Sequence, residues 1–191
     1  MGNNTWVNNL DPHPIARGAA FNTFTAAKDV SPVPLMLSYA NELKIGTKIQ
    51  MEAVGEFSTT GAPTMRLGFA YGITSAGGLL STGVELAASD LVATGTGAAA
   101  WGWHLNYLGI ITSVSTPASA TIYGSGVIDL ASSLVAMSTK PIPVTAAARS
   151  KTIDVSVLKT WHVFAEFGTS SVSNQVIVDY FSVKIENQGK T

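Results

Sequence analysis

The chain has 191 residues, a length that fits one domain with a hydrophobic core of its own. Charged residues make up only 12% of it, against about 25% in a typical soluble domain, whereas the 46% of hydrophobic residues is ordinary. The net charge of −1 and the absence of basic runs remove the electrostatic basis for binding nucleic acid. The lack of cysteine excludes disulfides and thiolate chemistry.

Ser, Thr, Gly and Ala take the place of the charged residues expected on the surface. Surface charge normally keeps soluble chains from associating, so a chain with so little of it is poorly protected against association. We therefore expect partner chains to cover much of the surface. The alternative is a soluble β protein whose surface is simply rich in Ser and Thr. The most apolar window, residues 97–114, is interrupted by His104 and Asn106, so we expect no membrane span.

Residues 1–40 are predicted to form an extended N-terminal arm, because four of the eight prolines lie at Pro12, Pro14, Pro32 and Pro34 and no periodicity is sustained. Its apolar residues argue against disorder, since disordered tails are poor in aromatics. The arm either packs on its own domain or reaches a neighbouring chain. The candidate contacts with a partner are Trp6, Leu10, Ile15, Phe21 and Phe24.

Residues 41–187 are predicted to form an all-β, antiparallel, jelly-roll-like sandwich, followed by a short tail at 188–191. Apolar and polar residues alternate along several segments, which is the pattern of half-buried strands, and Gly, Ser, Thr and Pro turns separate them. Residues 84–93 are the only helical candidate. Gly124 and Gly126 are expected to mark a bulge or a close approach. The predicted core includes Ile49, Met51, Phe57, Met65, Leu67, Phe69, Tyr71, Trp103, Tyr107, Ile122, Val155, Val157, Trp161, Phe167, Phe181 and Val183.

One strand, near residues 65–73, has an outer face of Arg66, Gly68, Ala70 and Gly72, where charged residues would be usual. Small residues let another backbone approach closely. We therefore predict that Gly68, Ala70 and Gly72 form an oligomer interface.

No catalytic, metal-binding or cofactor-binding residue is predicted. The pattern at residues 95–100 lacks the strand and helix that a dinucleotide site requires. His13, His104 and His162 are widely separated and have no clustered carboxylates, which makes a weak case for a metal. Trp101, Trp103 and Trp161 fall on the apolar side of their strands and are expected in the core, although exposed tryptophans would suit a carbohydrate-binding module.

Three segments, "ANELKIGTKIQMEAVGEFSTTGAPTMRLGFAYG", "GLLSTGVELAAS" and "FAEFGTSSVSNQVIVDYFSVKIEN", resemble a class of tailed-bacteriophage virion proteins. The likeness covers roughly residues 40–187 and consists of strands and turns without a catalytic signature; the connection at 138–151 departs from it. The resemblance implies a homotrimeric decoration (cement) protein on the outer capsid surface of the virion, with the major capsid protein as its partner. The alternative is a minor tail or tail-fibre protein.

Overall fold

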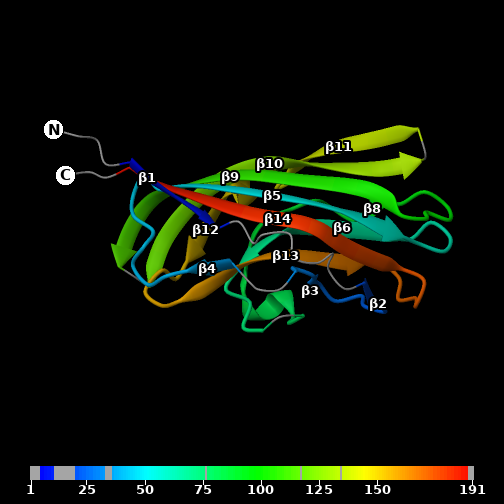
Figure 1. The fold of residues 1–191 in the computed structure, drawn as a ribbon, viewed down its shortest axis with the longest axis horizontal. Coiled ribbons are helices and arrows are strands. Elements are labelled where there is room, and N and C mark those ends of the chain that lie inside the picture. Colours follow the sequence, from blue (N-terminus) through cyan, green and yellow to red (C-terminus); the bar gives the residue numbers. More distant parts are fainter. Residues whose placement is uncertain are drawn as a thin grey trace.

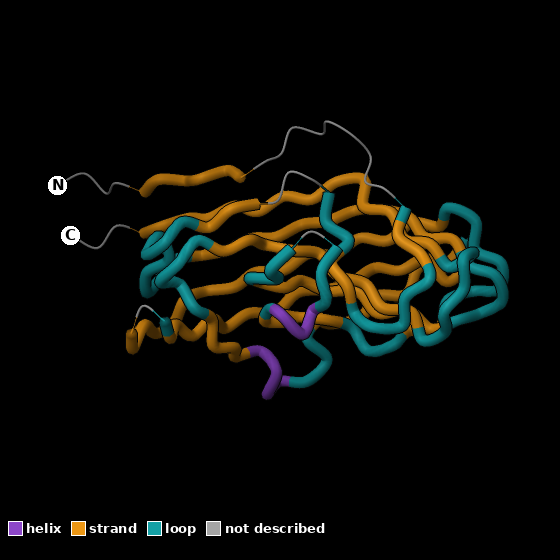
Figure 2. The backbone as a smooth tube through the Cα atoms, turned by 90° about the horizontal axis from the view of Figure 1, so that it is seen from below, coloured by secondary structure: helices purple, strands orange, loops and turns teal. Residues whose placement is uncertain are grey.

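The structure is a computed structural model that describes residues 5–10, 20–32, 36–75, 77–116, 118–133 and 135–188. Within them the chain folds into two antiparallel β-sheets packed as a sandwich (Figure 1). Figure 2 shows the strands running along the length of the molecule, with the two short 3-10 helices on one side. The predicted all-β sandwich is confirmed.

The larger sheet has the strand order β1-β14-β5-β9-β10-β11. Two short strands extend it, since β12 pairs with β10 and β2 pairs with β14. Its strands are β1 (Thr5–Leu10), β2 (Phe21–Asn22), β5 (Lys48–Ser58), β9 (Trp101–Thr116), β10 (Ser119–Ser133), β11 (Ala136–Ile142), β12 (Ser150–Ile153) and β14 (Gln175–Gln188).

The smaller sheet has the order β3-β13-β6-β7, with β4 also pairing with β13 and β8 with β6. Its strands are β3 (Lys28–Asp29), β4 (Met36–Ser38), β6 (Thr64–Tyr71), β7 (Val84–Ala88), β8 (Val92–Ala93) and β13 (Lys159–Phe167). The 3-10 helices are η1 (Leu80–Thr82) and η2 (Ala146–Arg149). Consecutive strands β5 and β6 lie in different sheets, as do β13 and β14, so the chain crosses between the layers and ties them together.

The core lies between the sheets and is filled by the inward side of each alternating strand. Trp103 and Trp161 are among its largest fully buried side chains, and Tyr71 packs on Trp161 with ring centroids 4.6 Å apart. Large aromatic side chains dominate core energetics through the area they bury. Almost every predicted core position is buried; the exceptions are Val157, which is 46% exposed, and Trp101, which is half-buried.

Gly124 and Gly126 mark close approaches, one of the two predicted alternatives. A Cβ on Gly124 would lie 2.3 Å from the Tyr107 hydroxyl, and one on Gly126 would lie 1.8 Å from the Asn106 carbonyl oxygen. Both distances are far below van der Waals contact. The Tyr107 ring therefore fills the space beside Gly124 that any larger side chain would need.

The helical alternative for residues 84–93 is wrong. These residues form β7 and β8, both paired with β6. Leu86, Ala87, Ala88 and Ser89 are buried in succession, which means that both faces of the strand end are covered. The good helix propensity of Leu and Ala is overridden because the strand has sheet partners and cover on both sides.

Candidate interaction surfaces

The predicted arm residues fall into three groups. Phe24 is only 4% exposed and packs on Phe167 with ring centroids 5.5 Å apart, so it belongs to the core and its prediction as a partner contact is wrong. Phe21 is half-buried in β2 and packs against the same core. Trp6 and Leu10 lie in β1, in register with Asn187 and Val183 of β14, and Ile15 lies outside the described residues. The described parts of the arm thus pair with the chain's own sheets.

The predicted oligomer interface is covered by the chain itself. Gly68 and Gly72 are buried, and Ala70 is 0% exposed in a small cluster with Ile73, Ala88 and Phe164. A Cβ on Gly68 would lie 2.7 Å from the Ala88 Cβ, so its smallness serves packing between β6 and β7. The reasoning that small residues on β6 require a second chain is therefore corrected, because a single chain already buries them.

Two segments that follow β2 and β6 form this cover on the smaller sheet. Their backbones pair: Asp29 N–H donates to the Gly78 carbonyl at 2.9 Å, and Leu80 N–H donates to the Ala27 carbonyl at 2.9 Å. Ala27 and Leu80 then pack against the cluster around Ala70. We name residues 27–31 with 77–80 the cover.

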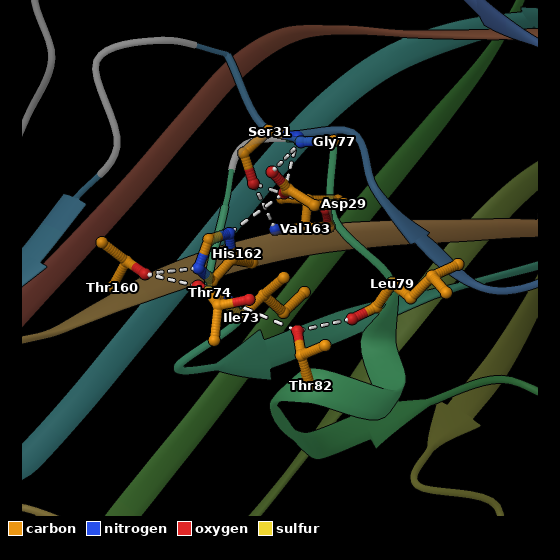
Figure 3. A network of polar contacts seen from close by, with 10 residues as sticks. All are labelled: Asp29, Ser31, Ile73, Thr74, Gly77, Leu79, Thr82, Thr160, His162 and Val163. Atoms are coloured by element: carbon orange, nitrogen blue, oxygen red, sulfur yellow. Dashed lines mark hydrogen bonds and ion pairs between the residues drawn. The ribbon is translucent and has the colours of Figure 1, made fainter.

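The cover is fixed to β13 by a buried polar network (Figure 3). One carboxylate oxygen of Asp29 accepts from Ser31 N–H and the other from Gly77 N–H, each at 3.0 Å. His162 Nδ1 lies 3.1 Å from Asp29 Oδ1, and both side chains are 0% exposed. Both carboxylate oxygens of Asp29 thus have backbone donors, which offsets the cost of burying this polar side chain. On the other side of the ring, His162 Nε2 lies 2.5 Å from the Thr160 hydroxyl.

Asp29, His162 and Thr160 lie side by side in the order acid, histidine, hydroxyl, which is the arrangement that nucleophilic catalysis uses. A substrate would have to reach both the hydroxyl and the histidine ring, and His162 is fully buried beneath the cover. The Thr160 hydroxyl also lies 3.3 Å from the Ile73 carbonyl oxygen, to which it can donate. We assign these three residues to anchoring the cover.

Arg66 covers another part of the outer side of the smaller sheet. Its guanidinium binds Glu85 at 2.5 Å and Glu166 at 3.3 Å, and its Nε donates to the Ser89 carbonyl. The same group lies 5.4 Å from the centre of the Phe164 ring, within the range of a cation–π contact. Arg66 therefore satisfies its charge within the chain while shielding Phe164.

The outer face of the larger sheet is different, because large apolar side chains stand exposed on it. Val54 is 38% exposed, Leu108 45%, Ile110 38% and Tyr123 47%. Ile110 is directly opposite Tyr123 on the neighbouring strand, and Leu108 is two residues away on the same side. We call Leu108, Ile110 and Tyr123 the open face; Val54 stands apart from them, opposite His104. Contiguous exposed apolar patches on a soluble chain mark contact sites more often than isolated ones do.

Charges of both signs surround the open face, and Lys48 lies directly opposite Ile110 on β5. His104 lies 3.0 Å from Glu52 and 3.7 Å from Asp129 across three adjacent strands, so it bridges the two carboxylates. Lys184 binds Glu186 at 2.7 Å, and this contact holds the pKa of the Glu186 carboxyl below its usual value.

A shallow hollow of about 420 Å³ lies beside Leu108, with Gln50, Asn106, Ser125 and Ser182 around it. The region is therefore nearly neutral, with polar groups that can still form hydrogen bonds.

The described residues contain no group of three or more His, Asp or Glu side chains placed to hold a metal ion. They also contain no helix long and apolar enough to cross a bilayer. Trp103 and Trp161 are buried as expected, and Trp101 is half-buried against Phe57, so these three offer no exposed platform for a sugar.

No protein-family model matches the chain, and no curated protein matches it with significant similarity. Functional inference therefore depends on the surfaces themselves.

Sequence reasoning missed the cover and its Asp29–His162 anchor. The only signals for them were an aspartate beside a valine in the arm and a histidine between two apolar strand residues.

Proposed function

We propose that this chain is a structural virion protein, a capsid decoration protein that binds the outer capsid shell as a trimer and stabilises it. The observation that carries the proposal is the contrast between the two sides of the sandwich. On the smaller sheet the cover and Arg66 bury Ala70 and Phe164, whereas the larger sheet brings exposed Leu108, Ile110 and Tyr123 together on neighbouring strands. A sheet that exposes adjacent large apolar side chains is suited to contact with a partner.

In this proposal the open face meets the major capsid protein. Leu108, Ile110 and Tyr123 supply apolar area that contact would remove from water, and the hollow beside them can receive a protruding side chain. Glu52 and Asp129 both lie beside His104, so contact with the shell would not leave these carboxylates without a polar neighbour. Three copies joined in one trimer would bind the shell at several points, so weak individual contacts add up through effective concentration.

Immunogold labelling of intact virions tests the location. Gold on the capsid supports the decoration role; gold confined to the tail supports the alternative of a minor tail or tail-fibre protein, which the same open face would serve.

The contact surface is tested by Leu108→Ser combined with Tyr123→Ser. Both side chains are partly exposed, so the variant is expected to fold normally and to lose virion binding. Val172→Ser, at an exposed position between β13 and β14 at the other end of the sheet, is the matched control. Retained binding by the double variant would refute the open face as the contact.

A further inference from the structure

The buried ring of His162 has a polar neighbour on each side, and the two neighbours come from different parts of the fold (Figure 3). Nδ1 lies 3.1 Å from Asp29 Oδ1 in the cover, and Nε2 lies 2.5 Å from the Thr160 hydroxyl. Thr160 and His162 are two positions apart on β13, so both side chains leave the strand on the same side. Since the ring is 0% exposed, these neighbours and not water determine where its protons lie.

The contact with Asp29 places a proton on Nδ1. Asp29 Oδ1 already accepts a hydrogen bond from Ser31 N–H, so a bare Nδ1 would face another acceptor. Nδ1 and Oδ1 are close without being aligned for a hydrogen bond, and the attraction between them is therefore electrostatic. With its proton on Nδ1, a neutral imidazole has an acceptor at Nε2, to which the Thr160 hydroxyl donates.

The Thr160 hydroxyl has a second acceptor within reach, because its oxygen also lies 3.3 Å from the Ile73 carbonyl oxygen. A hydroxyl has one proton to donate and two lone pairs, and the proton rotates to suit its neighbours. If Nε2 gains a proton, Nε2–H becomes a donor to the Thr160 oxygen, and the hydroxyl proton turns to Ile73. The ring, the hydroxyl and the carbonyl are then all satisfied without displacement of a heavier atom.

We propose that His162 takes up a proton while the cover stays closed, and that Thr160 accommodates this proton by turning its hydroxyl from Nε2 to the Ile73 carbonyl. Histidine side chains change their charge between about pH 5 and 8, and a buried Nε2–H without an acceptor would destabilise the closed cover. The hydroxyl thus keeps Ala70 and Phe164 buried in both protonation states of the ring. This role belongs to the free chain and does not depend on the virion function.

Other charged groups near this anchor do not supply the acceptor. Those on the outer side of the smaller sheet bind one another: Arg66 of β6, Glu85 of β7 and Glu166 of β13. Lys28 and Lys159 lie an odd number of positions from Asp29 and His162 on the same strands, so their side chains leave on the opposite side. Residues 77–80 of the cover carry no charge. The proton on Nε2 therefore depends on Thr160.

Nuclear magnetic resonance of the full chain between about pH 8 and pH 5 tests the proposal. The ring nitrogen shifts of His162 should change from one-proton to two-proton values, while the Ser31 and Gly77 amides stay protected from hydrogen exchange. The Ile73 carbonyl shift should move with the same midpoint, because the carbonyl gains its hydrogen bond from Thr160 only when the ring is doubly protonated. Constant ring shifts, or an Ile73 carbonyl that does not follow the ring, would overturn the proposal.

Thr160→Val removes the hydroxyl but keeps the shape, so a proton on Nε2 would face a methyl group. In this variant the Ser31 and Gly77 amides should lose protection at least about tenfold on acidification, after correction for intrinsic exchange, whereas the wild type should keep it. Thr160→Ser retains the hydroxyl and should behave like the wild type. Equal protection of the Val variant at both pH values would show that Thr160 does not accommodate the proton. If this variant does not fold, the wild-type ring and carbonyl shifts decide.

Discussion

Replacing Asp29 tests how the chain covers its own smaller sheet. The change Asp29→Ala removes the acceptor for the Ser31 and Gly77 N–H groups and the carboxylate beside His162. Since Asp29 and His162 are 0% exposed, water cannot take the place of the lost carboxylate without opening the cover. Each of the two buried N–H groups left without an acceptor costs about 1–3 kcal/mol, so together they are a large part of the roughly 5–15 kcal/mol that stabilises a typical domain.

Asp29→Asn separates the loss of the carboxylate beside His162 from the loss of both hydrogen-bond acceptors. The amide keeps one oxygen as an acceptor but presents an N–H₂ group toward a backbone donor, so we expect a smaller loss of about 1–3 kcal/mol.

Urea unfolding followed by tryptophan fluorescence measures both losses, because the indoles of Trp103 and Trp161 are buried in the folded chain. Asp154→Ala is the control, since Asp154 bonds only to the nearby Ser156 and should matter less. An Asp29→Ala protein as stable as the wild type would refute the anchoring role.

Three further predictions concern packing, ionisation and the apolar cluster on the outer side of the smaller sheet. Gly124→Ala places a Cβ against the Tyr107 hydroxyl and should cost about 1–3 kcal/mol in urea unfolding; an unchanged midpoint would show that the ring has room to move. Burial raises the pKa of Tyr71 to about 12, from 10.0. The folded state therefore holds this proton more tightly, so the contribution of Tyr71 to stability is fully present below pH 10 and is lost as the pH rises from 10 toward 12. A tyrosine absorbance titration checks it, and full ionisation of all five tyrosines near pH 10 in the folded protein would contradict it. Phe164→Ala should cost about 3–5 kcal/mol, because this fully buried ring fills the space between Arg66 and the cover; a loss below 1 kcal/mol would mean that the cover does not pack on it.

Alternation along the strands was enough to predict the sandwich and its core. In β5 and β6 the inward parity from Ile49 to Tyr71 was correct, because burial of one sheet face imposes a period of two on the sequence. The outer face of β6 was misinterpreted for a physical reason. Small, uncharged residues there show that something covers the strand, but they do not distinguish another chain from a distant part of the same one.

The cover depends on contacts that leave no periodic pattern. Asp29 and His162 meet although more than a hundred residues separate them, and neither stands in a recognisable motif. Phe24 was assigned to a partner contact because the proline-rich arm lacks alternation, yet its ring packs on Phe167. The open face could have been anticipated, since Leu108 and Ile110 lie on the side of β9 opposite to Trp103 and Tyr107.

Hydroxyl-radical footprinting of the open face, in isolated protein and in assembled virions, is the most direct test of the central claim. The side chains of Leu108, Ile110 and Tyr123 are exposed in the free chain and should be oxidised there. The account predicts that all three are strongly protected in the virion while exposed Val172, on another surface, reacts equally in both states. Equal oxidation of the open face in free and assembled protein would contradict it.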